Sequence, residues 1–244
     1  MLVSPDECAT APIELIGTAE LPDGGRLRLL RRGEDYSIRF GDNELMGNQV
    51  RHSEEALATL ACQRLVARDA RVLVGGLGMG FTLGAALRAL PRSAEIRVAE
   101  LIPEVVSWAK GPLVHLFHDY LSDPRVVLEL GDVHDVIAKA RGSFDAIMLD
   151  VDNGPDGLIH LANERLYCNW GLRAAHAALR SGGILAIWSA YSDDAFTTRL
   201  KNNGFDVEEV EVAAVVDGEN TVHTVWLASK RPDLAAELAS PAVS

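Results

Sequence analysis

Apolar and polar residues follow two different periods along this chain of 244 residues. Up to about residue 52 they alternate one by one, and Pro-Asp-Gly-Gly and Gly-Asp-Asn segments interrupt the alternation. A period of two with such turn residues is typical of half-buried strands joined by hairpins. We therefore predict a small N-terminal β-meander over residues 1–52.

From Ser53 the pattern changes to short apolar runs that alternate with segments of helical periodicity. Ser53 is the predicted N-cap of the first helix, because acids and then apolar residues at helical spacing follow it. Further helices are expected at 80–90, 103–110, 133–140, 163–179 and 193–204, and strands at 71–76, 95–101, 125–130, 144–150 and 184–190. Strict alternation of this kind predicts a parallel sheet covered by helices on both faces.

The chain closes with two predicted strands, 205–215 and 220–229, which a short turn joins. The last strand must therefore enter the sheet antiparallel, an unusual ending for a plain dinucleotide fold. The expected fold class is α/β, with a Rossmann-like, methyltransferase-type sheet. We assign the β-meander to residues 1–52, the Rossmann-like domain to residues 53–230 and a flexible tail to residues 231–244.

Charge and composition narrow the possible partners. The formal net charge of −12 disfavours binding to nucleic acid, whose phosphates would be repelled, and is compatible with a cationic small substrate. No apolar run is long enough to span a bilayer, and the first residues do not resemble a signal peptide. The three cysteines, Cys8, Cys62 and Cys168, are too widely spaced for a disulfide framework. We expect reduced thiols in a cytoplasmic protein without membrane contact.

A glycine-rich segment, VLVGGLGMGFTLGAAL, follows the first strand of the predicted α/β domain and opens a helix. Such a loop lets a ligand lie against the backbone, and the next strand ends in an acid, Glu100, about twenty residues later. Glu100 is placed to bind the ribose hydroxyls of an adenosine-containing ligand, although the glycines alone would also suit an ordinary turn. The predicted ligand-binding residues of these two segments are Gly75, Gly76, Gly78, Gly80, Glu100 and Leu101.

The next two strands also end in acids. Asp132 starts a helix, so it is either an N-cap or an acceptor for an adenine amino group, and both roles can hold together. Val133 beside it is assigned to the same ligand. Asp150 ends the following strand and is also assigned to this ligand. It opens the polar loop DVDNGPDG, in which Asp150, Asp152 and Asn153 are the candidate catalytic residues. Three acids around one crevice favour a cationic or hydroxyl-rich ligand.

Weaker candidates lie on the substrate side. Trp188 and Tyr191 follow the fifth strand and would enclose a substrate or a sulfonium group by cation–π contact, or only pack in the core. Glu54 is a candidate substrate-binding acid, but acids are common in a first helical turn because of the helix dipole. His115 and His118 are one turn apart without further ligands in a zinc motif, so no metal site is predicted.

Taken together, these segments resemble the spermidine synthase (polyamine aminopropyltransferase) family, within the class I S-adenosylmethionine-dependent methyltransferase fold. The resemblance covers roughly residues 15–212 and rests on the meander and on SEEALATLA, VLVGGLGMG, VAELIPEVV, DPRVVLELGD, FDAIMLD and LYCNWGLRAAHAALRSGGIL. It implies that S-adenosylmethionine, or its decarboxylated form, binds at the glycine loop, Glu100 and Asp132. It also implies a homodimer.

The chain departs from the family pattern where the family places acids for aminopropyl transfer. The family loop GGGDGG reads GGLGMG here, so that Gly78 replaces an acid, and the family's E-I-D-P reads ELIP, so that Ile102 replaces another. The family stretch DSSDPVGPAEGLFSEEFY aligns without a gap with DVDNGPDGLIHLANERLY, which puts Asn153 at the position of the catalytic Asp. In the family's Tyr-(His or Gln)-Glu triplet, only Glu55 fits.

These departures decide the functional expectation. An amide cannot take a proton from an attacking amine, whereas methyl transfer can proceed largely by positioning the nucleophile. The expected function is therefore that of a methyltransferase acting on a small molecule, with Asp152 as a candidate replacement for the missing base. The first alternative is a polyamine aminopropyltransferase that uses decarboxylated S-adenosylmethionine and an amine acceptor. The second alternative is a non-catalytic nucleoside-binding homologue.

Overall fold

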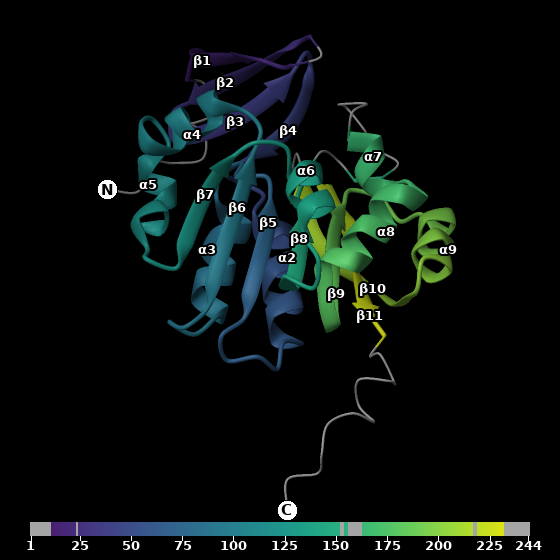
Figure 1. The fold of residues 1–244 in the computed structure, drawn as a ribbon. Helices are drawn as coiled ribbons and strands as arrows, with labels where there is room; N and C mark the ends of the chain where they lie inside the picture. The colour runs from purple at the N-terminus through teal and green to yellow at the C-terminus, as the bar shows by residue number, and fades with distance from the viewer. Residues whose placement is uncertain (1–10, 23, 152–153, 156–162, 217–218, 232–244) are drawn as a thin grey trace, which may run out of the picture.

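The computed structural model describes residues 11–22, 24–151, 154–155, 163–216 and 219–231 (Figure 1). Two of the candidate catalytic residues, Asp152 and Asn153, lie outside the described residues, and so do residues 232–244 of the predicted tail. The assignment of domain boundaries stays a prediction.

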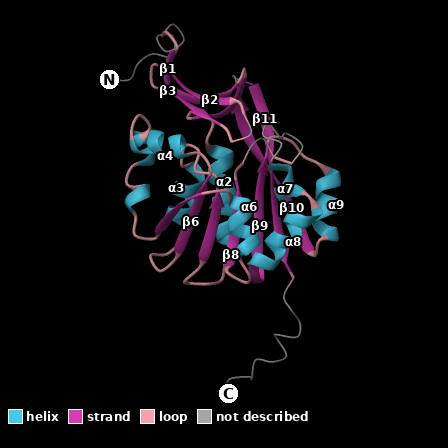
Figure 2. Cartoon of the chain, turned by 45° about the horizontal axis from the view of Figure 1, so that its top comes forward, coloured by secondary structure: helices cyan, strands magenta, loops and turns pink. Residues whose placement is uncertain are grey.

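The N-terminal segment forms the predicted β-meander. Four antiparallel strands follow one another in the sheet: β1 (Glu14–Glu20), β2 (Arg26–Arg32), β3 (Asp35–Phe40) and β4 (Asn43–Gly47). Alternate residues of β2 and β3, Leu27, Leu29, Tyr36 and Ile38, are buried, because one face of the sheet packs on the rest of the molecule. Figure 2 shows this small sheet above one edge of the larger sheet.

The larger sheet has seven strands in the order β10-β11-β9-β8-β5-β6-β7. Its parallel strands are β5 (Arg71–Gly75), β6 (Glu95–Glu100), β7 (Val126–Leu130), β8 (Phe144–Leu149) and β9 (Leu179–Ser189). The closing strands are β10 (Phe205–Val216) and β11 (Glu219–Lys230), and β11 lies antiparallel between β9 and β10. The predicted Rossmann-like, methyltransferase-type sheet with an antiparallel last strand is therefore confirmed.

Helices cover both faces of this sheet, as Figure 1 shows. One face carries α2 (His52–Gln63), α3 (Phe81–Ala89) and α4 (Pro103–Lys110), and beside α4 come α5 (Val114–Phe117) and a short 3-10 helix at Tyr120–Ser122. The other face carries α6 (Val133–Lys139), α7 (Glu164–Tyr167), α8 (Asn169–Ala178) and α9 (Asp194–Asn202). Neighbouring residues of β9 enter different cores: Ala186 packs with α2 and α3, whereas Leu185 and Ile187 pack with α8 and α9.

Two local predictions are wrong. Ser53 is not an N-cap, because α2 begins one residue earlier at His52 and the buried Ser53 hydroxyl donates to the Glu54 carboxylate instead. The predicted helix 163–179 is divided at Cys168, whose backbone is extended. The turn there is so tight that a Cβ on Gly171 would overlap the carbonyl oxygen of Arg165.

Three further properties concern the described residues only. Cys62 and Cys168 are free thiols. No helix in this part of the chain is long and apolar enough to cross a membrane. No group of three or more His, Cys, Asp or Glu side chains in it is arranged to hold a metal ion. His115 stacks on Tyr36 instead, with ring centroids 5.3 Å apart.

Candidate active site

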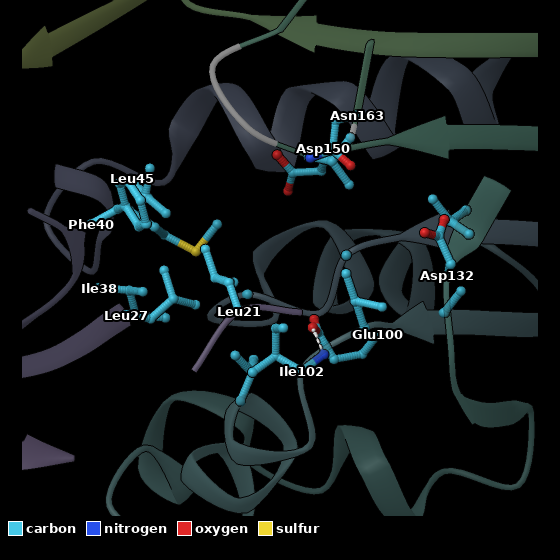
Figure 3. Close-up of a pocket in the computed structure, with 18 of the residues that line it drawn as sticks. Leu21, Leu27, Ile38, Phe40, Leu45, Glu100, Ile102, Asp132, Asp150 and Asn163 are labelled. Carbon is cyan, nitrogen blue, oxygen red and sulfur yellow. Dashed lines mark hydrogen bonds between the residues drawn. The ribbon is translucent and has the colours of Figure 1, made fainter. Parts of the chain in front are cut away.

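A cavity of about 180 Å³ lies where the carboxyl ends of β5, β6, β7 and β8 meet the N-terminal sheet. Ligands of open α/β sheets bind at this edge. Figure 3 shows its apolar wall, which comes from the N-terminal sheet and its turns, opposite the acids at the strand ends. The apolar wall includes Leu21, Leu27, Ile38, Phe40 and Leu45, and the acids are Glu54, Glu100, Asp132 and Asp150.

The glycine loop contributes two residues, Gly76 and Gly78, to the cavity wall. Both have a positive φ, of 89° and 48°. A Cβ on Gly76 would lie 2.6 Å from the backbone oxygen of Asp150, and one on Gly78 would lie 2.6 Å from Cε of Met46. Only glycine therefore suits position 76, where the clash is with backbone. At position 78 the neighbouring atoms belong to the end of the flexible Met46 side chain of β4, which lies over this glycine.

The other two predicted glycines do not line this cavity. A Cβ on Gly75 would lie 2.9 Å from Cγ2 of Val133, and one on Gly80 would lie 2.5 Å from the ring of Phe117. Gly75 thus allows α6 to pack closely on β5, and Gly80 allows α5 to pack closely on the start of α3. Leu101 and Val133, which follow the acids of β6 and β7, do line the cavity as predicted.

Glu100 is buried at the end of β6, and its carboxylate is held by backbone donors. Leu77 N–H donates to Oε2 and Ile102 N–H donates to Oε1, both at 2.8 Å. Figure 3 shows the hydrogen bond from Ile102. Burial raises the pKa of Glu100, and these backbone hydrogen bonds oppose that effect. Each carboxylate oxygen has a second lone pair. The arrangement fixes the carboxylate and leaves it able to accept from two hydroxyl groups.

Asp132 is the predicted N-cap and also lines the cavity, whereas its role as an acceptor for an adenine amino group stays a prediction. Its Oδ1 accepts from His134 N–H at 2.8 Å, so Asp132 is the N-cap of α6, and it also lines the cavity. Arg165 of α7 forms an ion pair with its Oδ2. The sequence contained no signal for this partner, because α7 is separated from Asp132 by more than thirty residues.

The fourth acid, Asp150, shares its side of the cavity with Glu54 of α2. The Thr82 hydroxyl donates to Asp150 Oδ2 at 2.6 Å and lies 3.3 Å from the backbone oxygen of Glu54. Burial, together with the neighbouring Asp150 carboxyl, raises the pKa of Glu54 to about 7. Burial also raises the pKa of Asp150 to about 6, against the hydrogen bond from Thr82. The cavity therefore contains two interacting carboxyl groups that titrate near neutral pH.

Glu54 continues into a buried polar chain that sequence reasoning missed. Ser53 Oγ donates to Glu54 Oε2 at 2.7 Å, and His223 Nδ1 lies 2.9 Å from Ser53 Oγ. Ser53, Glu54 and His223 are all buried. His223 is on β11, 170 residues away from Ser53, and its position in an alternating strand resembles that of any polar residue. No local motif could have indicated it.

A second cavity, of about 270 Å³, lies on the other side of this chain. Glu54 and Trp188 line both cavities, and His223 and Tyr191 line only the second. Trp188 is buried and packs edge-on against the His223 ring, with centroids 4.9 Å apart, whereas Tyr191 is 63% exposed. The two predicted aromatic residues thus occupy different places: Trp188 separates the cavities and Tyr191 stands at the outer one.

Comparison with known proteins identifies relatives of one kind. The chain is 32% identical over 117 residues to a polyamine aminopropyltransferase of Nitrosomonas europaea, a match that covers 48% of this chain and 34% of that protein. It thus spans about a third of the length of this curated relative. No family model matches the sequence.

Solved structures agree with this match. A spermidine synthase from Thermotoga maritima superposes with a TM-score of 0.69 at 16% identity, over 90% of this chain and 73% of that one. A spermidine synthase in complex with the transition-state analogue AdoDATO gives 0.69 at 17% identity, with the same coverage. A probable spermidine synthase from Corynebacterium glutamicum gives 0.63 at 15% identity, over 88% and 80% of the two chains. The predicted resemblance to the spermidine synthases, and their fold, are confirmed.

The expectation of a methyltransferase is wrong, because these relatives in sequence and fold are aminopropyltransferases and spermidine synthases. That expectation rested on the loss of acids at Gly78, Ile102 and Asn153. It gave too little weight to Glu54, a candidate acid from another element. Glu54 of α2 lies in the cavity beside Asp150, whereas Glu55, which the triplet alignment favoured, pairs with Arg88 at 3.1 Å.

Proposed function

We propose that this protein transfers the aminopropyl group of decarboxylated S-adenosylmethionine to a small amine. The observation that carries the proposal is the pair of carboxyl groups, Glu54 and Asp150, in a cavity whose opposite end presents Glu100. An ammonium group is bound best by carboxylates that are withdrawn from water. The relatives named above give the reaction class.

The nucleoside end of the cavity suits the sulfonium substrate. Glu100 retains acceptor positions for two ribose hydroxyls, and Asp132 lies at the end of the next strand, where an adenine amino group would donate. Gly76 and Gly78 allow the ligand to lie against the backbone. Decarboxylated S-adenosylmethionine would supply the electrophile, the aminopropyl carbon that is attached to the positively charged sulfur.

The acceptor end suits an amine. A primary alkylamine has a pKa near that of lysine, about 10, and arrives as an ammonium ion. It must lose one proton before its nitrogen can attack. Glu54 and Asp150 are placed to hold the ammonium group, and Trp188 forms the wall beside Glu54. The apolar wall contributed by β2, β3 and β4 suits the hydrocarbon part of the substrates.

The reaction balances without any further reagent. The neutral amine nitrogen forms a bond to the aminopropyl carbon as the carbon–sulfur bond breaks. The electron pair of that bond stays on sulfur, which becomes the thioether of 5′-methylthioadenosine. The elongated product leaves as a secondary ammonium ion. A role of Asp152 as the base and the assembly into a homodimer stay predictions.

Product analysis tests the proposal. The protein is incubated with decarboxylated S-adenosylmethionine and, in turn, with diamines and polyamines of increasing length, and the nucleoside and amine products are identified by mass. We expect 5′-methylthioadenosine and an amine that is longer by one aminopropyl group. Incubation with S-adenosylmethionine and the same amines is the matched control. S-adenosylhomocysteine in that control, with no elongated amine in the first reaction, would contradict the proposal.

A further inference from the structure

We propose that Glu54 is the base that deprotonates the acceptor amine, and that Ser53 and His223 pass the proton from Glu54 towards the second cavity. This inference rests on the proposed function, since it names the proton acceptor of that reaction. It assigns the role of the missing carboxylate at Asn153 to an acid from a different element, and it adds a histidine from the last strand.

The chain of contacts is continuous and shielded from water. Glu54 lines the cavity that would hold the substrates, Ser53 Oγ lies 2.7 Å from Glu54 Oε2, and His223 Nδ1 lies 2.9 Å from Ser53 Oγ. Ser53 has no exposed surface, and Glu54 and His223 are 7% and 8% exposed. A hydrogen-bonded chain in such surroundings transfers a proton between fixed partners, because no solvent competes for the donors.

The three heavy-atom positions fit two arrangements of protons. When Glu54 is ionised, His223 Nδ1–H donates to Ser53 Oγ and the Ser53 hydroxyl donates to Glu54. When Glu54 is protonated, Glu54 donates to Ser53 Oγ and the Ser53 hydroxyl donates to the lone pair of Nδ1, so that neutral His223 carries its proton on Nε2. The second arrangement therefore requires rotation of the Ser53 hydroxyl, a proton gained by Glu54 on the cavity side and the other tautomer of His223. Transfer through Ser53 to Nδ1 then gives an imidazolium ion, and loss of its Nε2 proton restores the first arrangement.

His223 connects this chain to the outside. His223 lines the second cavity together with the exposed Tyr191. The rings of His223 and Trp188 pack in a T-shaped arrangement, with centroids 4.9 Å apart. Burial lowers the pKa of His223, so it is neutral at pH 7 and able to accept a proton transiently. The second cavity gives that proton a way out without passing the substrates.

Asp150 is less suited to be the base, although it lies beside Glu54. Its Oδ2 accepts from Thr82, and the next polar atom beyond that hydroxyl is the backbone oxygen of Glu54, at 3.3 Å. A carbonyl oxygen does not take up a proton at neutral pH. Asp150 therefore holds the ammonium group and raises the proton affinity of Glu54 by its charge.

The proton balance of the step is closed. The ammonium group of the acceptor gives one proton to Glu54, and the neutral amine then attacks the aminopropyl carbon. Glu54 returns to its ionised state when the proton moves through Ser53 to His223 and leaves by the second cavity. The titratable groups that face this chain are Asp150 after β8, Glu55 on α2, Glu44 on β4 and Tyr191 after β9.

Three variants test the assignment in the full-length protein, with decarboxylated S-adenosylmethionine and the amine that the wild type uses. Glu54→Gln should lower kcat at pH 7 by about 100-fold or more, the range for loss of a general base. Ser53→Ala should lower kcat by about 10-fold and move the acidic limb of the pH profile to higher pH, because Ser53 stabilises the ionised Glu54. The controls are Glu104→Gln and Ser107→Ala, both on α4 and outside the lining of the cavity.

His223→Gln separates proton transfer from a structural role. Glutamine can still donate to Ser53 but cannot take up a proton. We expect kcat to fall by about 10-fold, KM for the amine to stay within twofold, and the solvent deuterium isotope effect on kcat to rise as proton release becomes limiting. His176→Gln on α8 is the matched control. Wild-type kcat and an unchanged isotope effect in His223→Gln would overturn the relay.

An NMR titration tests the relay without turnover. The side-chain ¹⁵N shifts of His223 should report a second inflection near pH 7 from Glu54 in the wild type, and this inflection should be lost in Glu54→Gln and in Ser53→Ala. An identical titration in all three proteins would overturn the coupling. If the wild type shows the coupling but elongates no amine, the proposed function fails. If it elongates amines and the variants keep its pH profile, only the relay fails.

Discussion

The two ends of the cavity hold their carboxyl groups in different ways. At the nucleoside end, Glu100 is fixed by two backbone N–H groups and Asp132 by the N-terminus of α6. At the acceptor end, Glu54 and Asp150 are held by the hydroxyl groups of Ser53 and Thr82, which can rotate. Backbone donors favour one charge state and one position, whereas a hydroxyl group can donate or accept.

This difference indicates a division of tasks. At the end proposed for the nucleoside, backbone donors fix the position of the acids, which suits recognition of a neutral ribose and base. The end proposed for the acceptor brings two carboxyl groups together. Burial raises both of their pKa values towards neutrality, and the neighbouring Asp150 carboxyl raises that of Glu54 further. Acids of this kind can exchange a proton with a bound amine.

The largest expected effect that tests this division is on stability. The folded-state pKa values of about 7 for Glu54 and about 6 for Asp150 lie above their ordinary values of 4.5 and 3.8. The folded state then binds more protons than the unfolded state, so the free energy of unfolding falls as the pH rises from about 4 to 7. At about 1.4 kcal/mol per pKa unit, the two shifts together correspond to a loss on the order of 6 kcal/mol.

Urea denaturation at pH 5 and at pH 8 measures this loss. The double variant Glu54→Gln/Asp150→Asn has no titrating groups at these positions, so its free energy of unfolding should change less than that of the wild type over this interval. Glu55→Gln is the single-site control and should keep the wild-type dependence. Equal pH dependence in the wild type and the double variant would show that the acceptor acids are not desolvated in solution.

The second prediction concerns Asp150 in the proposed reaction. Asp150→Asn keeps a hydrogen-bond acceptor for Thr82 but removes the charge that holds the ammonium group. The expected fall in kcat/KM for the amine is about 100-fold, since hydrogen bonds between charged groups contribute about 1.5–3 kcal/mol. The affinity for 5′-methylthioadenosine should stay within threefold. A loss confined to nucleoside affinity would place Asp150 at the other end of the cavity.

The third prediction applies to the nucleoside end. Glu100→Ala should weaken the binding of 5′-methylthioadenosine by about 2 kcal/mol, because two hydrogen bonds from the ribose to a charged group are lost. Calorimetry on the variant and on Glu95→Ala, at the half-buried start of the same strand, measures the difference. If Glu100→Ala binds 5′-methylthioadenosine as tightly as the wild type, Glu100 does not bind the ribose. That result would not affect the roles proposed for Glu54 and Asp150.

The fold was predictable because its signals are local. Each signal can be recognised within a short stretch of about twenty residues. The signals are the alternation of strands and helices, the glycine loop and the closing pair of strands, and the structure contains all three. The positions of Glu100 and Asp132 at one cavity were predictable for the same reason, since both lie at strand ends. The errors at Ser53 and Cys168 arose where a buried contact, rather than helix preference, decides the boundary.

The acceptor end was harder to predict because tertiary contacts assemble it. Glu54, Asp150 and His223 come from α2, the end of β8 and β11, and the sheet order alone brings them together. Glu54 was a candidate, but its neighbour Glu55 fitted the family alignment better, and only burial distinguishes the two. Matching the acids of this chain to the family pattern position by position therefore gave too few carboxylates for the site. This is why methyl transfer was favoured.

The smallest expected effect separates the two roles of Asp132. Asp132→Ala removes the N-cap of α6 and should lower the free energy of unfolding by about 1 kcal/mol. Asp193→Ala is the matched control, because Asp193 caps α9 through Phe196 N–H at 3.0 Å and does not line the cavity. Both variants should lose similar stability in urea.

Only Asp132→Ala should also weaken the binding of 5′-methylthioadenosine, by up to about tenfold, if the carboxylate accepts from the adenine amino group. The ion pair with Arg165 keeps this effect small, because the guanidinium group already occupies Oδ2. Arg165→Ala should therefore increase nucleoside affinity slightly, within about threefold, as an exposed ion pair contributes at most about 1 kcal/mol. If Asp132→Ala and Asp193→Ala bind the nucleoside equally well, Asp132 acts only as a helix cap. Adenine would then be recognised by the backbone of the strand ends.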